Sequence, residues 1–156
     1  MDRWDGLLNF RQLEDRIFTS GQPTEAQLPL LAAGGIQTVL NLALPTSPGA
    51  LPDEAASVTQ LGMEYLAIPV PFDAPTVAHW EAVRTALVTR MERKVWVHCA
   101  LNYRVSAFLA VYRVRELGWG PADAWRDLRT VWEPDPVWTA LLTDLGVPSP
   151  LRENSP

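Results

Sequence analysis

The chain has few of the residues that form disulfide frameworks, metal centres or membrane spans. Among its 156 residues are one cysteine and two histidines. A single cysteine excludes an intramolecular disulfide framework and fits a reducing compartment. Neither histidine stands at zinc-finger spacing from it, so no metal site is expected. No apolar run approaches the length of a membrane span, and the first residues lack the form of a secretion signal. We expect a cytoplasmic protein with no membrane partner.

Positive charge is also scarce. The chain has 13 Lys and Arg residues and 18 Asp and Glu residues, which gives a net charge of -5 and a pI near 5.0. This balance argues against nucleic acid or an anionic membrane as a main partner, and any attraction for phosphate has to be local. The length favours one domain, which we place at residues 1–146, followed by a tail at 147–156. The oligomeric state stays open.

Strand-like and helix-like patterns alternate along the chain. We expect strands at residues 16–19, 36–42, 63–70 and 94–98, and helices at residues 24–33, 53–61, 76–91, 105–117, 122–131 and 137–145. Such alternation with short turns predicts an α/β fold, with a central parallel-rich sheet of four or five strands and helices on both faces. Residues 1–15 are mixed and polar, and we interpret them as an extension packed over the domain.

The most informative stretch covers residues 95–106. An apolar, β-branched run ends on Cys99, and an amphipathic pattern begins a few residues later. This order predicts a buried strand, a tight loop and a helix whose N-terminus points back at the cysteine. Free N–H groups at a helix start attract anions. The same positive end, with Arg104 nearby, favours a thiolate nucleophile near neutral pH. The pattern thus favours covalent attack on a phosphorus held by the loop amides.

These residues resemble the signature loop of the cysteine-dependent protein tyrosine and dual-specificity phosphatases. That loop reads His-Cys, five residues, Arg, then Ser or Thr, and here His98-Cys99 is followed by Arg104 and Ser106. The resemblance extends to residues 20–24 and 35–42, which are similar to the start of many bacterial dual-specificity-like phosphatases. It implies the fold of that superfamily, a phosphorylated substrate, and neither cofactor nor metal.

The arginine departs from the family pattern. Four residues separate Cys99 from Arg104, so the arginine stands one position early and Val105 occupies its usual place. One residue near a helix start corresponds to a rotation of about 100°. Two orientations are therefore open: Arg104 clamps the phosphate through a re-shaped loop, or it points away. Asn102 replaces the usual loop glycine, and asparagine tolerates the positive φ of a tight turn. Tyr103 has no counterpart in the pattern.

The resemblance also implies roles for the loop residues. Cys99 is the nucleophile and Arg104 holds the phosphate. The other phosphate-binding positions are Ala100, Leu101, Asn102, Tyr103, Val105 and Ser106. His98 would steady the loop and the thiolate. Ser106 would donate a hydrogen bond to the cysteine sulfur, and the alternative is that it caps the helix that follows.

Two further residues are expected near the ends of neighbouring strands. Parallel sheets bind ligands beyond the carboxyl ends of their strands, where Asn41, the loop at 69–75 and Cys99 should converge. In that loop Asp73 is our candidate for the general acid, which later acts as the base for water. A turn-forming aspartate is the other interpretation of Asp73. Asn41 is assigned a supporting role.

Three functions are compatible with these residues. We favour phosphomonoester hydrolysis through a phosphocysteine. The second is a catalytically weak phosphate-binding module that uses the same loop, and the displaced arginine favours it. The third is sulfur transfer or arsenate reduction, and the lack of a second cysteine counts against the reductase. A cysteine that is merely a small buried hydrophobe is the alternative without a function.

Overall fold

The structure is a computed structural model that describes residue 4 and residues 6–150. Most of the expected tail, residues 151–156, lies outside the described residues, as do residues 1–3 and 5 of the segment considered for a secretion signal. Within the described residues, no helix is long and apolar enough to cross a membrane.

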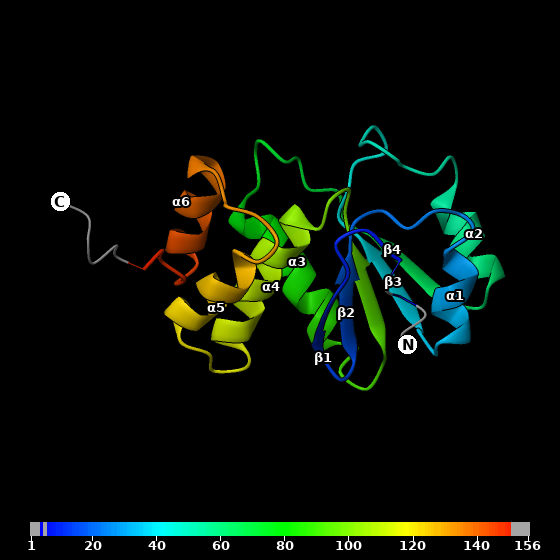
Figure 1. Ribbon diagram of the computed structural model, residues 1–156, viewed down its shortest axis with the longest axis horizontal. Coiled ribbons are helices and arrows are strands. Elements are labelled where there is room, and N and C mark those ends of the chain that lie inside the picture. Colours follow the sequence, from blue (N-terminus) through cyan, green and yellow to red (C-terminus); the bar gives the residue numbers. More distant parts are fainter. Residues whose placement is uncertain (1–3, 5, 151–156) are drawn as a thin grey trace.

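A five-stranded sheet runs through the middle of the molecule (Figure 1). Its strands are β1 (Arg11–Glu14), β2 (Ile17–Ser20), β3 (Thr38–Asn41), β4 (Glu64–Ala67) and β5 (Val95–His98). They lie in the order β1-β2-β5-β3-β4, so β5 is central. The four strands β2, β5, β3 and β4 are parallel, and β1 pairs antiparallel with β2 at one edge. The parallel-rich sheet predicted from the sequence is confirmed.

Helices cover both faces of this sheet (Figure 1). On one side are α1 (Leu28–Ala33) and α2 (Glu54–Gln60), and on the other are α3 (Val77–Val88), α4 (Tyr103–Arg115), α5 (Pro121–Leu128) and α6 (Pro136–Asp144). Local sequence sets where several of them begin. Asp53 accepts a hydrogen bond from Ala56 N at 3.1 Å, and Asp135 accepts one from Trp138 N at 2.9 Å with proline in the first turn. Aspartate is a preferred N-cap residue, and proline is favoured in the first turn of a helix.

The sequence prediction missed one element and misplaced another. Residues 11–14 form β1, although the segment was interpreted only as part of an extension. Its side chains are exposed or half-buried, so an edge strand of this kind has no alternating apolar pattern to reveal it. α4 begins at Tyr103, two residues before the expected start at 105. That shift decides where Arg104 points.

The two cores lie on opposite faces of β5. Val95 and Val97 belong to the larger apolar cluster, which includes α3 to α6. Trp96 belongs to the smaller cluster beside α1 and α2. Since successive strand side chains point to opposite faces, Cys99 follows Val97 onto the α4 side and His98 follows Trp96 onto the α2 side.

An ion pair holds the amino end of β4. This end of the sheet lies opposite to the carboxyl end of β5, where Cys99 follows. Arg90 donates to both carboxylate oxygens of Glu64, at 2.9 and 2.7 Å. Hydrogen bonding by Arg90 lowers the pKa of Glu64 from 4.5 to about 2. Glu64 therefore stays ionised far below neutral pH, and the pair persists wherever the protein is folded in mildly acidic solution.

Candidate active site

Cys99 follows the last residue of β5, where the carboxyl ends of the parallel strands meet. Every residue of β5 is buried, and Cys99 itself is 0% exposed. The loops that follow β3, β4 and β5 gather at the upper edge of the sheet in Figure 1. The Cys99 thiol therefore lies at the base of the space between these loops.

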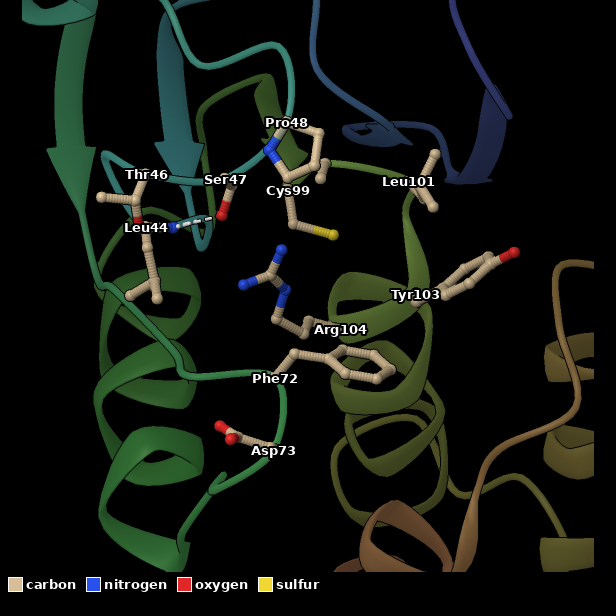
Figure 2. Close-up of a pocket in the computed structure, with 11 residues that line it drawn as sticks. Leu44, Thr46, Ser47, Pro48, Phe72, Asp73, Cys99, Leu101, Tyr103 and Arg104 are labelled. Atoms are coloured by element: carbon tan, nitrogen blue, oxygen red, sulfur yellow. Dashed lines mark hydrogen bonds between the residues drawn. The ribbon is translucent and has the colours of Figure 1, made fainter.

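These loops enclose a cavity of about 500 Å³. It is lined by Leu44, Thr46, Ser47, Pro48, Phe72, Asp73, Cys99, Ala100, Leu101, Tyr103 and Arg104. Figure 2 shows the sulfur of Cys99 and the guanidinium of Arg104 pointing into the same space. The structure therefore brings together the three residues that the sequence analysis placed at the centre of catalysis, Cys99, Arg104 and Asp73.

The loop after Cys99 turns sharply at Asn102. Its φ is 69°, in the left-handed region, so the tight turn foreseen at this asparagine is confirmed. The side chain is fully buried and holds the turn in place: Nδ2 donates to Asn9 O at 2.8 Å and to Thr19 Oγ1 at 3.1 Å. The turn is thereby fixed to the N-terminal segment and to β2.

Backbone hydrogen bonds set the direction of the loop's peptide groups. Ala100 O accepts from Gln22 N at 3.0 Å, and Leu101 O accepts from Asn9 Nδ2 at 2.9 Å. In a trans peptide the N–H of the next residue points the opposite way from the carbonyl. The N–H groups of Leu101 and Asn102 therefore lie on the loop face turned away from Gln22 and Asn9, where no described residue accepts a hydrogen bond from them.

The N-terminus of α4 adds further donors to this end of the cavity. The first N–H groups of a helix have no partner within it, and Asn102, at the N-cap, makes no side-chain capping bond. Tyr103 and Arg104, the first two residues of α4, line the cavity. The positive end of the helix dipole acts at the same place. An anion near Cys99 would be stabilised by both.

Arg104 is turned into the cavity, which answers the question of its orientation. Its side chain is 5% exposed, and Nη1 donates to Val70 O at 2.9 Å. Its Nε is buried without a hydrogen-bond partner among the described residues. Val105, at the position usual for the arginine, is fully buried in the apolar core. With Nη1 bonded to Val70 O and Nε enclosed by protein, Nη2 is the guanidinium donor left without a partner among the described residues and able to meet an anion in the cavity.

One wall of the cavity is aromatic. Phe72 and Tyr103 line it, and Tyr103 stacks on Trp132 with ring centroids 4.7 Å apart and 2° between the planes. Trp138 Nε1 donates to Phe72 O at 2.8 Å, which ties the loop after β4 to α6. The Arg104 guanidinium lies 5.9 Å from the centroid of Phe72. These contacts position the loop that carries Asp73.

Asp73 stands in that loop, at the rim of the cavity. The residue is exposed, and its carboxylate has no hydrogen-bond or ion-pair partner among the described residues. Figure 2 places the carboxylate on the other side of Phe72 from the Cys99 sulfur. Asp73 does stand in a turn, which Ala74 N closes by donating to Pro71 O at 3.2 Å, although the Asp73 carboxylate makes no hydrogen bond within the described residues.

His98, on the opposite face of β5, is held by a glutamate that the sequence analysis did not select. Its Nε2 lies 2.5 Å from Glu54 Oε2, and its Nδ1 lies 3.2 Å from Cys99 O. Gln22 Nε2 donates to the other oxygen of Glu54 at 2.8 Å. Both members of the pair are buried, with His98 0% and Glu54 6% exposed.

These contacts use both ring nitrogens of His98. A carbonyl can only accept, so Nδ1 donates to Cys99 O, and Nε2 shares a hydrogen bond with Glu54 Oε2. Burial raises the pKa of the neighbouring Tyr65 phenol, and the Glu54 carboxylate adds to the rise.

Five predicted site residues do not line the cavity: His98, Asn102 and Val105, described above, and Asn41 and Ser106. Asn41 Oδ1 accepts from Ala43 N at 2.9 Å and Nδ2 donates to Tyr65 at 3.1 Å, so Asn41 shapes the turn after β3. The Ser106 hydroxyl donates to Tyr103 O at 3.0 Å and lines a separate small cavity. The structure thus does not bring Ser106 to the Cys99 sulfur.

The described residues contain no group of three or more His, Cys, Asp or Glu side chains that could hold a metal ion. The sequence analysis did not identify three parts of the site, which are Glu54, Trp132 and residues 44–48. Residues 44–48 close the cavity opposite the aromatic wall. Within that stretch Leu44 N donates to Ser47 Oγ at 3.0 Å (Figure 2). Only its proline-rich composition marked it as a loop.

No protein-family model and no curated protein matches the chain. Solved structures do match. A candidate phosphatase (DUF442) from Shewanella putrefaciens CN-32 is 36% identical, aligns over 92% of this chain and 94% of its own, and gives a TM-score of 0.83. Tk-PTP in its active form is 21% identical, over 88% and 95% of the two chains, with a TM-score of 0.76. TpbA from P. aeruginosa, as a variant in complex with pTyr, is 22% identical, over 78% and 72%, with a TM-score of 0.65.

Proposed function

Because this chain belongs to the DUF442 family, within the superfamily of cysteine-dependent protein tyrosine and dual-specificity phosphatases, we propose that it hydrolyses phosphomonoesters through a phosphocysteine intermediate. One observation carries the proposal. The thiol of Cys99 and the guanidinium of Arg104 point into one cavity at the uncapped start of α4.

In the first step the Cys99 thiolate attacks the phosphorus and the bond to the ester oxygen breaks. The Arg104 guanidinium, the amides of residues 100–105 and the α4 dipole hold the phosphoryl oxygens, whose charge grows in the transition state. Asp73 gives its proton to the departing oxygen, so the alcohol leaves neutral. His98 holds the loop in position from the opposite face of β5.

In the second step water attacks the phosphocysteine. Asp73, now a carboxylate, takes a proton from the water as its oxygen bonds to phosphorus, and the S–P bond breaks to return the thiolate. The products are inorganic phosphate and the free enzyme. To act on the leaving oxygen, Asp73 has to move past Phe72, so the loop at 71–75 closes over the substrate.

Purified protein should hydrolyse a generic aryl phosphate in the presence of EDTA and without added metal. Cys99→Ser removes the nucleophile while changing one atom, and turnover should fall at least about 10⁴-fold. The melting temperatures of both proteins, measured in parallel, control for folding. Turnover that persists in Cys99→Ser would show that this cysteine is not the nucleophile.

A second candidate is a phosphate-binding module with little turnover. The exposed position of Asp73, across Phe72 from the sulfur, favours it. In that case the wild-type protein would be inert towards aryl phosphates, whereas phosphate or vanadate would still raise its melting temperature. The same assay, run with and without vanadate, separates the two functions.

A further inference from the structure

A second hollow adjoins the cavity above Cys99. It has a volume of about 340 Å³ and shares Pro48, Ala100 and Leu101 with that cavity. Figure 2 shows Pro48 and Leu101 on either side of Cys99. Leu8 and Leu51 form much of the remaining lining. We call this hollow the leucine groove.

The leucine groove is apolar and open. Leu8 is 47% exposed and Leu101 is 43% exposed, so both present apolar surface to a ligand. The polar side chains that line the groove already have partners: Gln22 Nε2 donates to Glu54, and Thr24 Oγ1 accepts from Gln27 N. Few polar groups remain in the groove to bind a polar ligand.

A glycine lets the N-terminal segment approach this loop. A Cβ at Gly21 would lie 2.6 Å from Ala100 O and 2.9 Å from Leu8 Cδ2. Both contacts are closer than a real Cβ allows, and the carbonyl is backbone that cannot turn aside. Gly21 is therefore required for Leu8 to lie against the loop that follows Cys99.

The charges of the lining residues also favour an uncharged, apolar group in the leucine groove. Among the described residues that line the cavity and the leucine groove, Arg104 is the one cation. The exposed acid Asp73 lines the cavity, and a neighbouring hollow of about 220 Å³ contributes the exposed acid Asp53. A second phosphate on the substrate would thus find no countercharge and would face carboxylates instead.

We propose that the leucine groove binds the alcohol portion of the substrate, and that the protein prefers monophosphates of extended, uncharged apolar alcohols over compact or multiply phosphorylated ones. This inference names the substrate class of the proposed function and rests on it. The phosphate would lie at Cys99 and Arg104, and the apolar portion would pass between Pro48 and Leu101 to reach Leu8 and Leu51.

Alkyl phosphonates, which carry no ester bond to hydrolyse, test the groove without turnover. Isothermal titration calorimetry with ethyl, butyl, hexyl and octyl phosphonate should give affinities that rise about two- to fourfold per buried methylene. Inositol hexakisphosphate should bind more weakly than the octyl compound. Leu8→Gln should flatten the dependence on chain length. Leu117→Gln, which alters a leucine of similar exposure (40%) beyond the far end of α4, should leave it unchanged.

Affinities that do not depend on chain length, a dependence that survives in Leu8→Gln, or tighter binding of the inositol polyphosphate would each overturn the proposal. Failure of the proposed function looks different. Phosphonates would then bind with the expected dependence on chain length while the corresponding alkyl and aryl phosphates are not hydrolysed.

Discussion

Arg104→Ala should lower kcat/KM for an aryl phosphate by about 10³-fold. Arg104 lines the cavity beside Cys99, so removing the guanidinium takes away a preorganised donor that acts on the growing charge of the phosphoryl oxygens. Arg104→Lys should recover little of this loss, because an ammonium cannot keep the bond to Val70 O and reach the phosphoryl group in the planar geometry of a guanidinium. Steady-state kinetics on the three proteins measures the effect.

Arg113→Ala is the matched control. Arg113 is on the same helix and is equally buried at 6% exposure, but it pairs with Asp127 and stacks on Trp119 at 4.2 Å. Its loss should lower the melting temperature and leave kcat/KM of the folded protein within a few-fold of wild type. Full activity in Arg104→Ala would mean that the early arginine does not bind the phosphoryl group.

Glu54→Ala should lower the free energy of unfolding by about 3 kcal/mol, because it leaves the buried His98 and the half-buried Gln22 without their hydrogen-bond partner. For a chain of this length, that is a fall of roughly 6–12 °C in melting temperature. Glu54→Gln should cost much less, since an amide can donate to a neutral His98 Nε2 and still accept from Gln22. Chemical denaturation followed by circular dichroism gives the free energies.

Glu64→Ala serves as the comparison for this loss. Glu64 also forms a hydrogen-bonded pair, with Arg90, but its side chain is 35% exposed and lies at the end of the sheet away from Cys99. A partly solvated pair contributes about 1 kcal/mol or less. If Glu54→Ala and Glu64→Ala cost the same, the buried pair behind Cys99 has no special part in holding the loop.

Local rules predicted most of the elements. The caps at Asp53 and Asp135 depend on one residue and the N–H groups next to it, so they could be identified without tertiary contacts. α1 shows where such rules fall short. Thr24 and Gln27 form the expected capping box, yet residues 25–27 remain a turn and the helix begins at Leu28. Pro29 accounts for the late start, since proline belongs in the first turn of a helix.

The sequence predicted the site residues that belong to a motif, but not those that distant segments bring together. The sequence identified Cys99 and Arg104 but left the direction of the arginine open, because that depends on the residue at which α4 begins. Glu54 was missed because it reaches His98 across 44 residues of chain. Trp132 was missed likewise, because its stacking on Tyr103 depends on how the segment after α5 returns to the cavity.

The most direct test of the central claim is the mass of the protein after reaction. Quenching a reaction with an aryl phosphate by rapid denaturation, in wild type and in Asp73→Ala, should trap one phosphoryl group per chain, and peptide mapping at alkaline pH should place it on Cys99 as an acid-labile, base-stable phosphocysteine. Asp73→Ala should accumulate more of it, because hydrolysis of the intermediate loses its base. Steady turnover with no phosphoryl group on Cys99, in both proteins and at every quench time, would contradict the account.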